Sequence, residues 1–141
     1  MPLQEHQLSD EIRKQAGANP RILLRRRNVG RYLAVSGQLQ DAVSVLRACG
    51  ISARPVVVGD AGEADLQGLI ADWPCQHCGR AAHPMPLAVE VKSDSGRLSE
   101  LQTNWRDNAW LRRGGLYVLA APRAGLTLAQ SAAQIIREFI R

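Results

Sequence analysis

Three consecutive segments carry most of the information about the fold: Leu87-Ala-Val-Glu-Val-Lys92, a helical pattern from Ser99 to about Arg113, and the apolar run Leu116-Tyr-Val-Leu-Ala-Ala121. The first run alternates as a half-buried strand does, and residues 94–96 make a turn. Ser99 and Gln102 have the spacing of a capping box, and Gly114-Gly115 is a helix stop. This order predicts a βαβ crossover, and therefore an α/β fold in which the two strands are parallel neighbours.

The rest of the chain adds elements on either side of this unit. Helices are expected at Ser9–Ala16, where Ser9 is the cap, at Asp41–Cys49 and from Thr127 to about Ile140, and strands at Ile22–Asn28, Pro55–Val58 and Leu66–Ala71. Residues 73–86 hold three prolines, two cysteines and two histidines, and are expected to form a loop inserted in a hairpin. With 141 residues, the chain is expected to be one domain, a mixed sheet core flanked by helices.

Charge and composition narrow the class of function. The net charge is +5, and seven basic residues lie between Ile12 and Gln40 with no acid among them. Such a stretch is typical of a phosphate-facing surface, although a solvated basic face has the same composition. Six aromatic residues argue against a stacking platform for single strands. The candidates for backbone contacts with nucleic acid are Arg25, Arg26, Arg27, Arg31 and Arg97.

The compartment is expected to be the cytoplasm. No apolar run approaches the roughly 18 residues of a membrane span, and residues 1–10 are polar, unlike a signal peptide. The three cysteines, an odd number, do not suggest a disulfide framework.

One set of residues has the composition of a catalytic centre. Asp65 begins a predicted strand after a glycine-rich loop, and Glu90 and Lys92 are two apart on the next strand, so their side chains share a face. If the two strands pair, two carboxylates and an amine converge, with the Val91 carbonyl as a further ligand. Such oxygens suit Mg²⁺ or Mn²⁺, and the set suits phosphodiester hydrolysis. The alternative is an ordinary amphipathic strand whose charges are solvated.

The insert carries a second candidate metal site. Cys75-x-x-Cys78-Gly79 has the form of a zinc knuckle, and His83 is a plausible third ligand. The fourth ligand would be His77, Cys49, water or a residue of a second subunit. A bound Zn²⁺ would be structural. The alternative is two free thiols in a surface loop.

Four segments follow one another in an order that has a counterpart in a known family: Asn28-Val29-Gly30, Gly62 to Gly68, Ala88 to Ser93 and Gly96 to Gln102. This order resembles the VRR-NUC nucleases of the restriction-endonuclease-like, PD-(D/E)xK superfamily. The resemblance covers residues 11–118. Ala64 stands where the superfamily pattern has proline, and residues 38–58 do not align.

The resemblance implies roles for individual residues. Asp65 and Glu90 would be metal ligands, Lys92 the catalytic lysine, Gln102 the glutamine of the following helix, and Glu11 the acid of the first helix. Gln102 has a competing explanation in the capping box, and Glu11 in a favourable first helical turn.

The resemblance also implies a function, an endonuclease that cuts branched DNA such as four-way junctions and acts as a homodimer. The alternatives are a non-catalytic DNA-binding protein on the same fold and a small zinc-containing interaction protein.

Overall fold

The computed structural model describes residues 3–27, 30–31, 39–50, 57–58, 62–74, 78–79 and 81–140, which fall into two compact units. The smaller unit, residues 28–60, contains a helix and a two-stranded antiparallel sheet: β2 (Gly30–Arg31), α2 (Leu39–Ala48) and β3 (Val57–Val58). The larger unit, residues 1–27 and 61–141, contains all the other elements: α1 (Leu3–Gly17), β1 (Ile22–Arg26), β4 (Leu66–Pro74), β5 (Ala81–Val91), α3 (Glu100–Asn104), η1 (Trp105–Trp110), η2 (Leu111–Arg113), β6 (Leu116–Ala120) and α4 (Leu128–Phe139).

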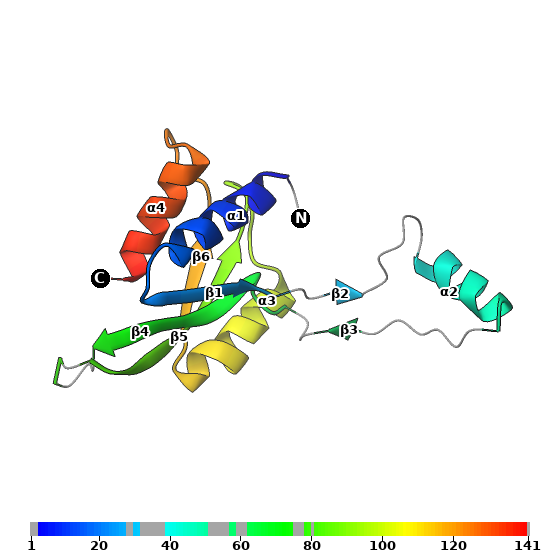
Figure 1. Cartoon of the computed structure of the whole chain (residues 1–141), viewed down its shortest axis with the longest axis horizontal. Coiled ribbons are helices and arrows are strands. Elements are labelled where there is room, and N and C mark those ends of the chain that lie inside the picture. The colour runs from blue at the N-terminus through cyan, green and yellow to red at the C-terminus, as the bar shows by residue number, and fades with distance from the viewer. Residues whose placement is uncertain are drawn as a thin grey trace. The chain divides into compact units, whose positions relative to one another are not determined.

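The larger unit is built on a four-stranded mixed sheet in the order β1-β4-β5-β6 (Figure 1). β4 is antiparallel to β1 and to β5, whereas β5 and β6 are parallel and joined through α3, η1 and η2. The predicted crossover and the predicted α/β class are therefore confirmed.

The two faces of the sheet are covered differently. Leu87, Val89 and Val91 of β5 lie in the main apolar core, with Leu8 of α1 and Ile135 of α4. The intervening residues of β5 point to the opposite face. On that face Ala88 packs with Ala64 and Trp105 in a smaller cluster beneath η1. Glu90 and Lys92 continue the row of Ala88, so they lie on the face that α3 and η1 cover.

The helix predicted from Ser99 begins as expected but does not continue as one α-helix. Ser99 and Gln102 form a capping box, and Gly114 ends the segment with φ 84°. Between them, residues 105–110 are a π-helix. Trp105 and Trp110 would lie about 140° apart on an α-helix, whereas five residues make about one π turn. The π turn therefore brings both rings to one side, where their centroids are 5.1 Å apart.

The loop expected over residues 73–86 is mostly strand, so this prediction was wrong. β4 continues to Pro74, β5 begins at Ala81, and Trp73 pairs with His83. β6 pairs with β5 only from Leu87 onward, so none of the described strands pairs with the earlier part of β5 on that side. A proline there removes no ladder hydrogen bond, and Pro86 is tolerated within the strand.

The first helix begins earlier than expected. α1 starts at Leu3, and Ser9 is a buried residue inside it rather than its cap. The last helix begins as predicted, because Thr127 forms a capping box with Gln130. None of the helices in the described ranges has the length and apolar content needed to cross a membrane.

Candidate active site

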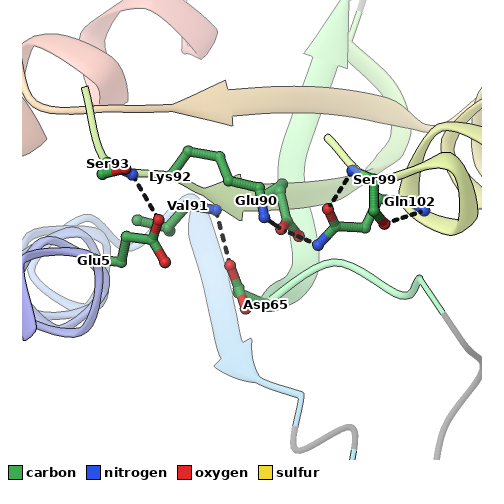
Figure 2. A network of polar contacts seen from close by, with 8 residues as sticks. All are labelled: Glu5, Asp65, Glu90, Val91, Lys92, Ser93, Ser99 and Gln102. Carbon is green, nitrogen blue, oxygen red and sulfur yellow. Dashed lines mark hydrogen bonds and ion pairs between the residues drawn. The ribbon is translucent and has the colours of Figure 1, made fainter. Parts of the chain in front are cut away.

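The structure brings Asp65, Glu90 and Lys92 together where β4 begins and β5 ends (Figure 2). The Lys92 Nζ lies 2.7 Å from the Glu90 Oε1. The backbone N–H of Val91 donates to the Asp65 Oδ2 at 2.9 Å. The convergence expected from the spacing of these residues is therefore present.

Two glycines allow the elements that carry these side chains to approach closely. Gly68 of β4 lies so near β1 that a Cβ there would be 1.6 Å from the Leu23 carbonyl oxygen. Gly62, with φ +84°, precedes Asp65, and a Cβ there would be 2.3 Å from the Leu101 carbonyl oxygen in α3. The loop that carries Asp65 therefore lies directly against the helical turn that carries Gln102.

Glu90 is the most enclosed member of the group, with 1% of its side chain exposed. Its Oε1 accepts from Lys92 and from the Gln102 Nε2. Its Oε2 is buried and has no hydrogen-bond partner in the described part of the chain. A buried carboxylate oxygen without a partner is costly, and it is a position at which a ligand would compensate the lost hydration.

Gln102 closes the predicted capping box and also donates a hydrogen bond to Glu90. Its Oε1 accepts from the Ser99 N–H at 3.0 Å to close the capping box, while its Nε2 donates to Glu90. The two ends of one amide thus link the start of α3 to the buried carboxylate. Capping and contact with the site are not alternatives here.

Burial raises the pKa of both Asp65 and Glu90 above their ordinary values. The Val91 N–H and the charge of Lys92 oppose this effect at Asp65, and the hydrogen bond from Lys92 opposes it at Glu90. The charge of Asp65 also raises the pKa of Glu90. Two carboxylates in this condition attract a cation, because positive charge favours their ionised forms.

A third acid belongs to this group, and it is not the one expected. Glu5 of α1 is buried and accepts from the Ser93 N–H at 2.7 Å, just beyond the end of β5 (Figure 2). Its charge contributes to raising the pKa of Asp65. Glu11 lies six residues further along α1, where its Oε1 is 3.9 Å from the Lys14 Nζ. The sequence signal for Glu5 is its spacing from Leu8, Ile12 and Ala16, since residues at intervals of three or four share one helix face.

Tyr117 of β6 also lies near the carboxylates, although nothing in the sequence identified it as a site residue. It pairs with Ala88 in the parallel ladder, one row before Glu90, and its hydroxyl is buried without a partner among the described residues. Burial, and secondly the charge of Glu90, raise the pKa of this hydroxyl. The phenol therefore remains protonated beside the carboxylates.

The expected DNA-contacting arginines are distributed around β1 and the loop before α3. Arg25 and Arg97 are exposed, and the Arg27 Nε donates to the Glu63 Oε1 at 3.1 Å. Arg26 is half-buried, its Nη2 lies 2.8 Å from the Asp10 Oδ1, and its charge lowers the pKa of Asp65. Arg31 belongs to the smaller unit.

The expected zinc ligands are only partly described. Cys75 and His77 lie outside the described residues. Cys78 is exposed and free of any disulfide, and His83 is exposed within β5 rather than in a loop. The zinc site stays a prediction.

The residues of the main site fit a divalent cation that prefers oxygen ligands. Across the described ranges no three His, Cys, Asp or Glu side chains are grouped to hold a metal, so the fit rests on fewer carboxylates. Glu90 offers its unpartnered Oε2, and Asp65 lies beside it. The N–H and C=O of a strand residue point to the same side, so the Val91 carbonyl is directed toward Asp65, as its N–H is.

A scan against models of protein families found no match, and searches among characterised proteins and solved structures likewise returned no similar chain. The function of the chain is therefore inferred from the geometry of the site.

Proposed function

We propose that this protein is a metal-dependent nuclease that hydrolyses phosphodiester bonds in DNA. The observation that carries the proposal is the enclosed group of Asp65, Glu90 and Lys92, in which a buried oxygen of Glu90 has no hydrogen-bond partner among the described residues. Paired carboxylates beside a lysine are the set that metal-assisted phosphate hydrolysis requires. The mixed sheet with helices on both faces is compatible with a restriction-endonuclease-like fold, and the sequence motifs resemble the VRR-NUC family.

Asp65, Glu90 and the Val91 carbonyl would hold Mg²⁺ or Mn²⁺. When bound, such a cation polarises a phosphoryl oxygen and lowers the pKa of a coordinated water. Positive charge at this position would also lower the pKa of both acids, which opposes the effect of burial.

The chain's own residues supply the positioning and the charge. The Lys92 side chain is 16% exposed, and its ammonium group lies 2.7 Å from the Glu90 Oε1. At that position it would orient an attacking water and stabilise negative charge on the phosphate. Gln102 holds Glu90 from the opposite side. The Val91 N–H holds the Asp65 carboxylate, so neither acid has to rotate into place.

The substrate is proposed to be branched DNA, with a homodimer as the active form, as the family resemblance implies. Arg25, Arg27 and Arg97 would contact the phosphate backbone at exposed positions. Contacts of this kind position a duplex without reading its sequence, so recognition by shape is expected, with affinity that falls steeply with salt.

The test uses the only two lysines of the chain, Lys14 and Lys92. Cleavage of a labelled four-way junction and a matched linear duplex is measured with Mg²⁺ or Mn²⁺ for wild type, Lys92→Ala and Lys14→Ala. Lys14 is 78% exposed on α1 and serves as the matched control. We expect junction cutting that is lost in Lys92→Ala and kept in Lys14→Ala. Equal cutting by both variants contradicts the proposal. Tight, salt-sensitive binding without cutting by wild type would instead support a non-catalytic DNA-binding protein.

A further inference from the structure

A small hollow lies on the same side of the sheet as the carboxylates. It is lined by Pro86, Ala109, Trp110, Arg113 and Gly115, and its volume is about 240 Å³. This is below the roughly 300–1,000 Å³ of pockets for drug-sized ligands, so it suits a single flat ring system. Its lining is mainly apolar, with one guanidinium.

The indole of Trp110 is held rigidly in the wall of this hollow. Its Nε1 donates to the Leu116 carbonyl at 2.9 Å, and a Cβ at Gly115 would lie 2.4 Å from that nitrogen. Its ring stacks on Trp105 at an interplanar angle of 23°, and Trp105 in turn contacts Tyr117 at 6.4 Å between centroids. Three of the six aromatic residues of the chain are therefore gathered here, and a wall that is fixed in advance loses little entropy when a ring stacks on it.

The charge at the hollow has the sign that a nucleic acid requires. Arg113 is exposed, and its Nη1 donates to the Ala109 carbonyl at 2.8 Å, which holds the guanidinium beside the indole. A guanidinium attracts phosphate and stacks on or donates to a base. An apolar slot with a rigid indole and an arginine suits a nucleobase better than an aliphatic ligand.

The hollow is connected to the carboxylates by β5 itself. Every second side chain along this strand lies on the same face, and this row runs through Pro86, Ala88, Glu90 and Lys92. The hollow is at the Pro86 end of the row, and the carboxylates are at the other end. Four residues of strand separate Pro86 from Glu90, which corresponds to about 13 Å. A DNA strand whose phosphate lies at the carboxylates would therefore place the base of a nearby nucleotide at the hollow.

We propose that this hollow binds one unpaired nucleobase of the DNA strand whose phosphate lies at Asp65 and Glu90. The inference rests on the proposed nuclease function and adds a specificity to it. A base within an intact duplex is stacked and paired and does not enter, whereas an unpaired base at a branch or flap enters without that cost. Among branched substrates, the hollow therefore favours those that have an unpaired nucleotide at a set distance from the cut, such as a flap, over a fully paired four-way junction.

The test is a scan with abasic sites. A flap oligonucleotide carries one tetrahydrofuran abasic residue, moved one nucleotide at a time, and the affinity of the wild-type protein is measured by fluorescence anisotropy in EDTA, where no cutting occurs. We expect one position, or two adjacent ones, to weaken binding by roughly five- to 150-fold, which corresponds to the ~1–3 kcal/mol of one stacked base. Equal affinity at every position overturns the inference.

Two variants and a control assign the effect to the hollow. Ala109→Leu fills the space, and Arg113→Gln, at an exposed position, removes the guanidinium with little risk to folding. Both variants are expected to reduce the dependence of the affinity on abasic position. The control variant Arg112→Gln changes another exposed arginine and should keep this dependence. A dependence that survives in both pocket variants places the base elsewhere and refutes the inference.

Cleavage distinguishes this inference from the proposed function. If cutting requires Lys92 but the affinity is the same at every abasic position, the proposed nuclease function is supported and the base-binding hollow is refuted. If the affinity depends on the abasic position but no cutting occurs in Mg²⁺ or Mn²⁺, the base-binding hollow is supported and the nuclease function is refuted.

Discussion

Replacing Gly62 by alanine tests how the site is assembled. The new Cβ would lie 2.3 Å from the Leu101 carbonyl oxygen, about 1.1 Å short of the 3.4 Å at which ordinary contact begins. That oxygen is backbone, so the loop before Asp65 must move away from α3. The left-handed φ of +84° adds strain of about 1–2 kcal/mol, and the overlap adds about 1–3 kcal/mol. We expect a loss of about 2–5 kcal/mol in the free energy of unfolding, and a displacement of about 1 Å at the site, which would lower kcat/KM by about 100-fold.

Gly114 provides the matched control for this substitution. It has the same φ of +84°, but a Cβ there would meet nothing within 4 Å. Gly114→Ala should therefore cost only the backbone strain, about 1–2 kcal/mol, and leave cleavage unchanged. Urea denaturation and junction cleavage are measured for both variants. Equal losses of stability and equal activity in the two would refute the idea that close contact between the Asp65 loop and α3 sets the geometry.

Other substitutions test the acids and the buried phenol. Glu5→Gln should lower kcat/KM by about 10- to 100-fold, as loss of an outer contact to a metal site does, whereas Glu11→Gln should leave it unchanged; the reverse order would restore Glu11 as the acid of the first helix. Burial raises the pKa of Asp65 above 3.8, so the folded protein binds a proton at this carboxylate more tightly than the unfolded chain does. The protonated carboxyl therefore contributes stability below pH 3.8, and this contribution is lost as the pH rises through the raised pKa of the folded state. Asp65→Asn should therefore abolish cleavage yet be more stable than wild type at pH 7 without metal, with a shallower fall in stability as pH rises; thermal unfolding across pH 4–8 measures this, and a less stable variant at pH 7 would contradict it. Tyr117→Phe removes a buried hydroxyl that has no hydrogen-bond partner within the described ranges, and it should raise the free energy of unfolding by about 1 kcal/mol in urea titrations. A decrease would show that the hydroxyl is satisfied.

The central trio could be predicted because its geometry depends on short-range rules. Alternation puts Glu90 and Lys92 on one face of a strand whatever the rest of the fold does. Asp65 needed only that its strand be antiparallel to theirs, which the register of Leu66 with Val89 provides. The capping role of Gln102 followed from its spacing from Ser99, which specifies the start of the helix, whereas its place beside Glu90 was expected only from the family resemblance.

Glu5 was missed because the start of α1 was misplaced. A cap at Ser9 excluded residues 3–8 from the helix, although Leu8 is fully buried in the core. The identity of the acid that reaches β5 depends on how α1 docks on the sheet, and docking is a tertiary property. Tyr117 was missed for a similar reason, since an apolar strand reads the same on both faces until its neighbours are known.

The crossover from Leu87 to Ala120, the caps at Ser99 and Thr127, and the shared face of Glu90 and Lys92 could all be inferred from the amino-acid sequence, because each follows from local periodicity and backbone hydrogen bonding. Which helical acid joins Asp65 depends on tertiary packing. The same packing gathers half of the aromatic residues beside the site, where composition alone argued against a stacking surface. It also left the Glu90 Oε2 buried with no hydrogen-bond partner in the part of the chain that the structure describes. These features depend on contacts between residues far apart in the chain, and no local pattern encodes the burial that such contacts produce.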